Sequence, residues 1–356
     1  MPDRVLVTGG AGYIGSIVTT QLLQKGYDVV VYDNLGNGHK AAVPKRAKLV
    51  VGNTSDRPAL NRIFKKYRFD GVIHMAASIE AGESMKYPEQ YFRNNTANTL
   101  TLLEVVLAHK VPRFVFSSTA AVFGMPDRTP IEENDPVHPT NTYGESKLLV
   151  EHMLDWFHRI HGLRYACLRY FNAAGATQDQ GEAHHPESHL IPLILQVAQG
   201  KRDHISIFGI DYETPDRTCI RDYIHVSDLA SAHVLTLDAL RKQDKLVYNL
   251  GNGRGFSVRE VIETARKVTG HPIPAKEVPR RPGDPAILVA SSEKIRRELH
   301  WQPQYSNLEA IVGSAWDWFR AHPGGYDVPK PNASASKRKS TARVKPVSAK
   351  KKPRKK

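Results

Sequence analysis

The chain has 356 residues and a mass of 39.8 kDa, enough for one large domain or two merged ones. Hydrophobic residues make up 40% of it and charged residues 24%, and no stretch approaches the roughly 20 consecutive apolar residues of a membrane span. The two cysteines, Cys167 and Cys219, form no CxxC pair, which favours a reducing compartment without disulfides. Residues 4–10 lead directly into a strand pattern, so we expect no signal peptide and a cytoplasmic protein.

The positive charge is concentrated at the C-terminus. The formal net charge is +14, but residues 330–356 hold 12 Lys or Arg and no acidic residue, which leaves 38 basic and 36 acidic residues in positions 1–329. A nearly neutral body argues against a nucleic acid as the main ligand. The tail has few large apolar residues, so it is predicted to be disordered. Two interpretations of it stay open, a solubilising extension or a segment that binds polyanions weakly.

Short segments rich in Val, Ile or Phe are expected to be buried parallel strands, at Val5–Thr8, Asp28–Tyr32, Lys48–Val51, Gly71–His74, Arg113–Ser117 and Tyr165–Arg169. Helical patterns lie between and after them, at Ile14–Lys25, Arg57–Tyr67, Tyr91–His109, Tyr143–His161, Asp228–Leu240, Val258–Val268 and Leu308–Arg320. This alternation predicts βαβ units and a parallel sheet with right-handed crossovers. From about residue 171 the pattern becomes less regular, which suggests a smaller region that covers a substrate.

A glycine-rich turn follows the first predicted strand. Residues 10–15 read Gly-Ala-Gly-Tyr-Ile-Gly, a GxGxxG motif that opens a predicted helix, where the pyrophosphate of a dinucleotide would sit on the helix N-terminus. Asp33 ends the next strand, where a carboxylate can accept hydrogen bonds from a ribose diol. No arginine follows directly to receive a 2′-phosphate, so the pattern predicts NAD rather than NADP. The alternative is a strand–helix turn without a ligand.

A second motif, YxxxK, lies on a predicted helix. Tyr143 and Lys147 are four residues apart and therefore share one helical face. A nearby cation, together with a positively charged nicotinamide, favours the phenolate, so such a tyrosine can act as a general base near neutral pH. Hydroxyl side chains in residues 117–119 close the preceding strand at the carboxyl end of the sheet, where ligands bind in such folds. The alternative is a half-buried tyrosine beside an exposed lysine.

These segments resemble the extended short-chain dehydrogenase/reductase family, in residues 8–15, 32–35, 116–119 and the YxxxK motif. Within it, residues 169–175, 220–226 and 280–284 are similar to those of the UDP-glucose 4-epimerases, and the likeness covers about residues 3–322 in unbroken order. Related sugar-nucleotide 4,6-dehydratases carry Asp-Glu after the serine-threonine strand end, whereas this chain has Ala120-Ala121. The resemblance implies a doubly wound Rossmann fold with a smaller α/β substrate-binding region.

The resemblance also implies a reaction that interconverts UDP-glucose and UDP-galactose. Thr119 would hydrogen-bond the sugar O4, Tyr143 would remove its proton, and Lys147 would bind the nicotinamide ribose and lower the Tyr143 pKa. The C4 hydride would pass to NAD⁺, the 4-keto sugar would turn over in the pocket, and the hydride would return to its other face. Members of the family usually dimerise through helices flanking the YxxxK helix, so a homodimer is expected.

The positions matched to the cofactor are Gly9, Gly12, Tyr13, Ile14, Gly15, Asp33, Asn34, Asn53, Thr54, Met75, Ala76, Ala77, Asn94, Ser117, Tyr143, Lys147 and Phe171. The positions matched to the UDP-sugar are Thr119, Tyr143, Asn172, His189, Leu190, Phe208, Arg221, Tyr223, Arg281, Asp284 and Leu288. We therefore predict an NAD-binding Rossmann domain in residues 1–170, to which residues 218–250 return. Residues 171–329 form the UDP-sugar region and 330–356 the tail.

Three other interpretations stay open: a 4-epimerase of UDP-N-acetylhexosamines or UDP-pentoses, a non-catalytic protein that binds NAD and UDP-sugars, and a nucleic-acid-binding protein that uses its tail. Leu288 matches a gate residue facing the sugar C2 substituent, and its intermediate size predicts secondary activity on UDP-N-acetylglucosamine. His184, His185 and His189 suggest a metal, but no carboxylate cluster is seen to complete a ligand set, so no metal is expected. Aromatic residues 316, 318 and 319 are interpreted as core.

Overall fold

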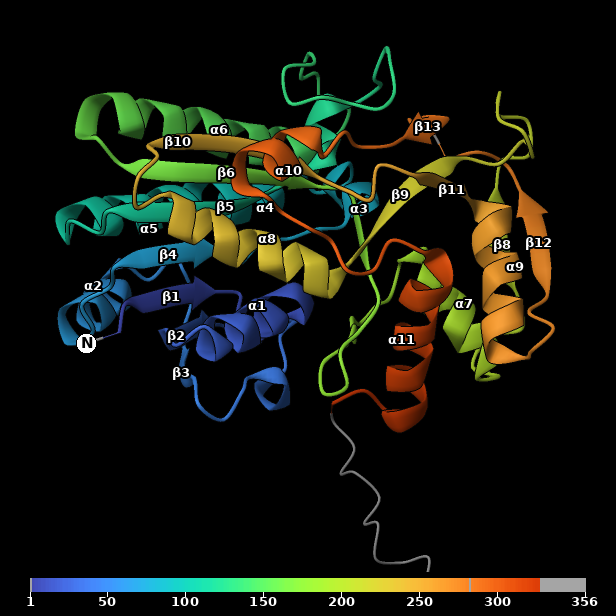
Figure 1. Cartoon of the computed structure of the whole chain (residues 1–356), viewed down its shortest axis with the longest axis horizontal. Helices are drawn as coiled ribbons and strands as arrows, with labels where there is room; N and C mark the ends of the chain where they lie inside the picture. The colour runs from blue at the N-terminus through green and yellow to red at the C-terminus, as the bar shows by residue number, and fades with distance from the viewer. Residues whose placement is uncertain (1, 282, 327–356) are drawn as a thin grey trace, which may run out of the picture.

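The larger of the sheets carries the predicted cofactor half of the protein. The computed structural model describes residues 2–281 and 283–326, and the tail at residues 330–356 lies outside them. Seven parallel strands run in the order β10-β6-β5-β4-β1-β2-β3 (Figure 1). Their bounds are β10 Lys245–Leu250, β6 Arg164–Tyr170, β5 Arg113–Thr119, β4 Gly71–His74, β1 Arg4–Thr8, β2 Asp28–Asp33 and β3 Lys48–Val51. All six predicted strands are confirmed.

Helices cover both faces of this sheet, because alternate side chains of each strand point to opposite sides. In β1, Val5 and Val7 pack with side chains of α1 and α8, whereas Leu6 packs with those of α2, α5 and α6 on the other face. The doubly wound fold predicted from the sequence is confirmed (Figure 1). The bounds are α1 Tyr13–Gln24, α2 Arg57–Lys66, α5 Asn98–Ala108, α6 Thr142–His161, α8 Val226–Ala239 and α10 Glu293–Leu299.

A smaller α/β region follows β6. In one small sheet, β9 pairs in parallel with β7 and β13 and antiparallel with β11, and a separate pair joins β8 to β12. Three helices share a hydrophobic core with these strands, and the predicted core residues Trp318 and Phe319 are buried in it. The bounds are β7 Asn172–Ala174, α7 Leu190–Ala198, β8 Ile205–Phe208, β9 Ile220–His225, β11 Gly255–Ser257, α9 Val258–Thr269, β12 Ala275–Val278, β13 Ile287–Leu288 and α11 Leu308–Ala321.

The helix predicted over Tyr91–His109 is wrong in its first third. The chain forms α4 (Pro88–Tyr91), then a π-helical segment η2 (Phe92–Ala97), and only then α5. The wider turn carries two adjacent asparagines that both contact Ser78: the Asn94 amide donates to its hydroxyl and the Asn95 amide to its carbonyl, each at 3.0 Å. A π segment inserts an extra residue into the turn, which re-aims side chains at functional sites. Other short helices are η1 Lys40–Ala42, α3 Ala81–Ser84 and η3 Ala120–Phe123.

A buried ion pair fixes α6 against the sheet. The Arg169 guanidinium on β6 donates from Nη2 to the Glu151 carboxylate at 2.6 Å and from Nε at 3.0 Å, and both side chains are less than a tenth exposed. The Ser118 hydroxyl on β5 donates to the same carboxylate. Breaking one partner of such a pair leaves a buried charge unpaired and typically costs about 3–5 kcal/mol. The pair therefore holds the YxxxK helix in a fixed position over β5 and β6.

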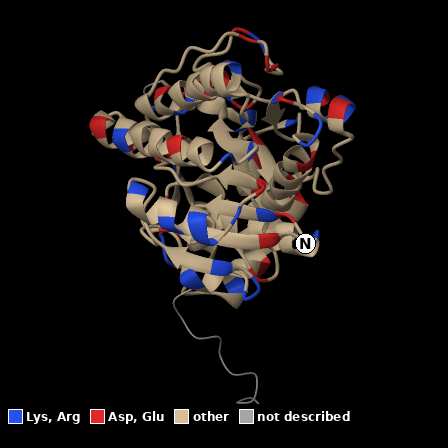
Figure 2. Ribbon diagram, turned by 90° about the vertical axis from the view of Figure 1, so that its left-hand side faces the viewer, with Lys and Arg blue, Asp and Glu red and all other residues tan. Residues whose placement is uncertain are grey.

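The surface of the described body carries both signs of charge. Figure 2 shows Lys and Arg interspersed with Asp and Glu over the ribbon, as expected for a body with 38 basic and 36 acidic residues. Within the described ranges, no helix combines the length and apolarity that crossing a bilayer requires.

Candidate active site

Tight packing of glycines shapes the turn between β1 and α1. Gly9 has φ +72°, and a Cβ placed there would lie 2.6 Å from the backbone nitrogen of Ala76 on the neighbouring chain segment. A Cβ on Gly15 would lie 2.2 Å from the Gly9 carbonyl oxygen, so only glycine lets the helix start approach the strand end. Gly12 is the N-cap of α1 and offers no side-chain cap. The first backbone N–H groups of α1 therefore remain available to an anion.

This helix start opens into a cavity of ≈ 640 Å³ at the carboxyl ends of the large sheet. Sixteen of the seventeen positions predicted for the cofactor line it, and the exception is Ser117, whose hydroxyl lies 3.3 Å from His233 Nε2. Volume, glycine cradle and free helix terminus together fit a dinucleotide. Other residues line the cavity that the sequence does not predict as cofactor or substrate contacts. They are Tyr32, Gly36, Asn37, Gly38, Gly52, Ser78, Ile79, Gln90, Tyr170, Ala173, Glu182 and His184.

Asp33 stands at the cavity wall with its carboxylate oriented by the backbone. Its Oδ2 accepts a hydrogen bond from the Ala11 N–H at 2.9 Å and its Oδ1 accepts one from the Leu35 N–H at 2.8 Å. A carboxylate oxygen has two lone pairs, so both oxygens can still accept a further bond from a ligand hydroxyl. The backbone thus aims this carboxylate where the sequence predicts a ribose.

Thr119, Tyr143 and Lys147 meet at the opposite end of the same cavity. Thr119 is the last residue of β5, and the other two lie in the first turns of α6, whose N-cap Asn141 accepts from the Gly144 N–H at 2.9 Å. A Cβ on Gly144 would lie 2.5 Å from the Ala121 carbonyl oxygen, so this glycine lets α6 settle directly on η3. All three side chains line the cavity, and Thr119 hydrogen-bonds Tyr143.

The electrostatics of this group differ from the sequence-based expectation. Burial raises the pKa of Tyr143, although a hydrogen bond from Thr119 acts in the opposite direction. Burial also lowers the pKa of Lys147 to about 7; its ammonium lies 4.9 Å from the Phe116 ring centroid and donates to the Ser117 carbonyl at 2.9 Å. The surroundings of Tyr143 in the protein thus raise its pKa, and the main cause is burial of the phenol itself.

The remaining predicted substrate residues lie outside the cavity lining and are here called the second group of substrate residues. Arg221 on β9 donates to the Pro285 carbonyl at 2.9 Å, and its Nη2 lies 3.5 Å from Asp284 Oδ1. The Arg281 guanidinium lies 3.9 Å from the ring centroid of Phe208 at the end of β8. The group comprises Leu190, Phe208, Arg221, Tyr223, Arg281, Asp284 and Leu288, whereas Asn172 and His189 line the cavity itself.

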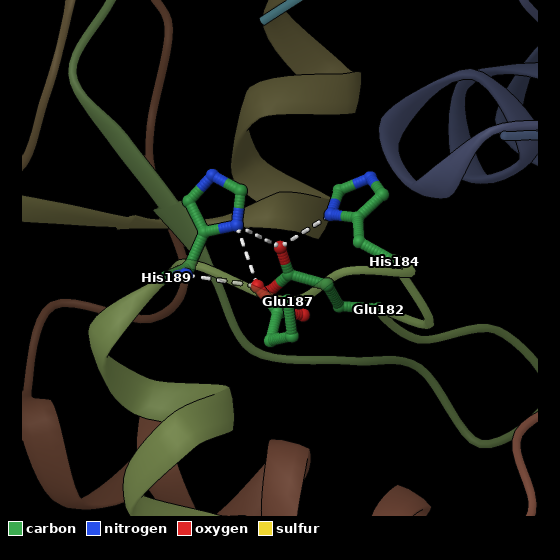
Figure 3. Close-up of side chains that lie close together, drawn as sticks. All are labelled: Glu182, His184, Glu187 and His189. Atoms are coloured by element: carbon green, nitrogen blue, oxygen red, sulfur yellow. Dashed lines mark hydrogen bonds and ion pairs between the residues drawn. The ribbon is translucent and has the colours of Figure 1, made fainter. Parts of the chain in front are cut away.

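A cluster of glutamates and histidines corrects the expectation that no carboxylates accompany the histidines. Glu182, His184, Glu187 and His189, here called the Glu/His cluster, bring one ligand atom each to within 4.8 Å of one another (Figure 3). His185 does not belong to it. Burial alone would raise the pKa of Glu182 and lower those of the two histidines. The attraction between carboxylate and imidazole outweighs burial, so the pKa of Glu182 is lowered and those of His184 and His189 are raised. The alternating spacing E-x-H-x-x-E-x-H was the overlooked signal.

The burial of Lys147 yields a prediction about stability. Lys147→Met removes an amine that is costly to bury when charged, so we expect the ligand-free protein to gain about 1–4 kcal/mol in free energy of unfolding at neutral pH. In the wild type the Lys147 pKa is 10.5 in the unfolded chain and about 7 in the folded protein, so between these pH values the unfolded chain binds the proton and the folded protein does not. Wild-type stability should therefore rise with pH across that window, and the advantage of the variant should shrink.

Urea unfolding at two pH values within this window measures both effects. Lys65→Met, at an exposed lysine on α2, serves as the matched control and should leave stability nearly unchanged at both. A Lys147→Met protein that is less stable than the wild type at neutral pH would contradict the prediction.

Comparison with known proteins agrees with this geometry. The profile of the NAD dependent epimerase/dehydratase family matches residues 5–251. A UDP-glucose 4-epimerase of Halalkalibacterium halodurans is 54% identical over 325 residues, which cover 90% of this chain and 97% of the relative. A crystal structure of a UDP-glucose 4-epimerase superposes with a TM-score of 0.90 at 50% identity, covering 92% of this chain and 100% of that one.

A further solved structure, the UDP-glucose 4-epimerase of Bifidobacterium longum in complex with NAD⁺ and UDP, has a TM-score of 0.87 at 40% identity and covers 90% of this chain and 99% of its own. The similarity to these epimerases thus extends beyond the glycine turn and the YxxxK group to nearly the whole described chain. The chain belongs to the NAD dependent epimerase/dehydratase family, among the UDP-glucose 4-epimerases.

Proposed function

We propose that this chain is an NAD-dependent isomerase that interconverts UDP-glucose and UDP-galactose. The observation that carries the proposal is the convergence of Thr119, Tyr143 and Lys147 on one wall of the cavity that opens from the glycine turn. A base, a hydroxyl partner and an amine beside a dinucleotide site suit removal of a proton from a sugar hydroxyl. The printed names of the relatives support the same activity.

The residues present fit NAD. The α1 N-terminus and the glycine cradle would hold the pyrophosphate, Asp33 would accept hydrogen bonds from a ribose, and Asn53 and Thr54 line the far part of the cavity where adenine would lie. Tyr13 is anchored by its hydroxyl, which donates to the Gly175 carbonyl at 2.5 Å. When bound, NAD supplies an acceptor and later a donor for the hydride at the sugar C4.

The chain's own residues handle the proton. Thr119 and Tyr143 share a hydrogen bond, so a sugar O4 placed between them would meet one partner that holds it and one that takes its proton. Lys147, whose amine donates to the Ser117 carbonyl, lines the same cavity and lies one helical turn after Tyr143. After the 4-keto sugar has turned over, Tyr143 would return the proton to O4, which makes the cycle neutral in protons.

The second group of substrate residues would hold the UDP. Arg221 and Arg281 are permanently charged and planar, which suits bidentate contact with a diphosphate. Their guanidinium groups are oriented by the Pro285 carbonyl and by the Phe208 ring, respectively. Because the nucleotide would be held outside the cofactor cavity, the sugar alone would have to reach Tyr143 and could rotate about its link to the diphosphate.

Removing the Tyr143 hydroxyl tests this assignment. Tyr143→Phe should lower turnover by about 10²–10⁴, as expected for loss of a general base, while NAD stays bound. Purified variant and wild type are compared by the rate of UDP-glucose formation from UDP-galactose and by the nicotinamide released on denaturation. Tyr67→Phe, at a half-buried tyrosine that follows α2 and does not line the cavity, should leave both unchanged. Near-normal turnover of Tyr143→Phe would contradict the assignment.

Leu288 bears on the range of substrates. It is half-buried on β13 and packs against a hydrophobic cluster that includes Phe171 at the cavity wall and Ala120 beside Thr119. A leucine leaves more room than a tyrosine, so the wild type should show measurable but secondary turnover of UDP-N-acetylglucosamine. Leu288→Tyr should lose that activity and keep the turnover of UDP-galactose, as separate assays would show. Equal loss on both substrates would contradict a gate at this position.

We also propose a homodimer that uses the outer surfaces of α5 and α6. Trp156 and Ile160 lie one turn apart on α6 and are 60% and 67% exposed, and Leu100 on α5 is 38% exposed. Such large apolar side chains on neighbouring helices favour contact with a second copy of the same surface. Trp156→Glu should shift the protein to monomers in light scattering. Val51→Glu, at an equally exposed apolar residue on β3, is the control and should not.

We also propose that the chain divides into two regions near residue 170 and that the protein is cytoplasmic. Separate hydrophobic clusters under the large sheet and around α7, α9 and α11 support the predicted boundary near residue 170. Two buried thiols, Cys167 and Cys219, support a cytoplasmic location, since free cysteines are typical of reducing compartments.

A further inference from the structure

The Glu/His cluster lies on the loop between β7 and α7, and among its members only His189 is a predicted contact of the UDP-sugar. Its members face one another across a small space, as Figure 3 shows: both imidazole rings turn Nδ1 toward the Glu182 carboxylate. His184 Nδ1 lies 3.0 Å and His189 Nδ1 2.9 Å from the same oxygen, Oε1. The Glu187 Oε1 atom lies 2.9 Å from His189 Nδ1 as well. Four ligand atoms from one short segment thus converge on a single point.

The two carboxylates of this cluster need positive charge beside them. The two glutamate side chains are 6% and 5% exposed, and oxygens of both contact the same imidazole nitrogen. Two carboxylates held this close in a buried place repel each other unless positive charge lies between them. Two protonated imidazoles supply that charge in the absence of a metal, and a divalent ion bound by two neutral imidazoles would supply the same charge in their place.

The ligand types and distances select a class of ion. Two imidazole nitrogens and two carboxylate oxygens are ligands that suit Zn²⁺, which usually binds four of them in a tetrahedron. With bonds of about 2.0–2.1 Å, neighbouring ligand atoms in such a site are about 3.3 Å apart. Three of the pairs here are 2.9–3.0 Å apart, and no pair exceeds 4.8 Å. Shifts of an ångström or less in side chains would therefore admit the ion.

The backbone around the cluster is held on both sides, as a preformed site requires. Before it, the Gln180 amide donates to the Ala42 carbonyl at 2.8 Å, and the Gly181 N–H donates to the Tyr326 hydroxyl at 2.9 Å. After it, His189 is the N-cap of α7, and its own N–H donates to Glu187 Oε1 at 2.8 Å. Neither end of the segment is left to move freely.

The cluster also has an entry path. Glu182, His184 and His189 line the large cavity, and the His184 ring lies edge-on to Tyr13 at 6.4 Å between centroids. We propose that the Glu/His cluster binds one divalent transition-metal ion of the Zn²⁺ class, which fixes the loop that forms this wall of the cavity. The site is distinct from the residues proposed to move the proton.

The proposal is tested by titrating Zn²⁺ into protein without an affinity tag, treated with a chelator and otherwise as purified, with any nucleotide it carries. One ion per chain is expected, with a rise in melting temperature that grows with Zn²⁺ concentration. Co²⁺ in its place should give the visible absorption of a tetrahedral site. Mg²⁺ should not compete, because it prefers six oxygen ligands and retains waters.

Variants separate this site from adventitious binding by the chain's other histidines. His184→Asn keeps the contacts between His189 and both glutamates and should weaken Zn²⁺ binding at least tenfold, and Glu182→Gln should do the same. His185→Asn, one residue away and outside the cluster, is the matched control and should bind as the wild type does. Circular dichroism checks that each variant is folded, and His184→Asn is the less disruptive of the two because the His184 side chain is 17% exposed and that of Glu182 only 6%.

Two results would overturn the proposal. Wild-type protein that binds no stoichiometric Zn²⁺ would mean that protons alone hold the cluster together. Equal affinity in the wild type, His184→Asn and His185→Asn would place the bound ion elsewhere on the surface. Because each readout is metal binding or melting rather than turnover, neither result depends on whether the epimerase assignment is right.

Discussion

The position of α6 on the large sheet is the constraint on which the candidate active site depends. Three contacts fix it along its length: Gly144 against the Ala121 carbonyl, the Lys147 ammonium on the Ser117 carbonyl, and Glu151 in its ion pair with Arg169. All three partners belong to β5, β6 or the turn after β5. A shift of the helix by one residue would break all of them together, since helical residues one apart lie about 100° around the axis. Tyr143 therefore faces Thr119 because the whole helix is fixed in register.

Much of the fold could be predicted because its strands are short, apolar and buried on both faces. Val5–Thr8 and Gly71–His74 read as continuous apolar runs, and the structure moves the first only by adding Arg4. The π-helical turn could not be predicted in this way. It depends on hydrogen bonds from Asn94 and Asn95 to Ser78, far away in sequence, whereas the local pattern of residues 91–109 fits one continuous helix.

The candidate site was predictable where a motif fixes both residue type and spacing. The glycine turn predicts the cofactor cavity, and the YxxxK motif predicts the residues at its reactive end. Both could be found because each motif lies within one strand–helix unit. The pKa of Tyr143 was not predictable from spacing alone, because its main cause is burial of the phenol, and only the folded packing sets that burial. The Glu/His cluster was missed for a related reason: its members alternate along a loop without periodic structure, so only the folded loop brings their side chains together.

The electrostatic state of the ligand-free protein indicates how binding and chemistry would be coupled. Lys147 is a buried amine close to losing its charge, and Tyr143 is a phenol whose burial opposes ionisation. Burial therefore works against the charged forms of both groups, and a positive charge beside the phenol would offset the desolvation of the phenolate. An oxidised nicotinamide would bring that charge only when bound, whereas its reduced form is uncharged and would leave the proton on Tyr143. On the proposed function, deprotonation of the sugar would therefore be favoured when the cofactor can accept the hydride, and return of the proton when it has one to give. The burial that raises the Tyr143 pKa would thus keep proton transfer and hydride transfer in step.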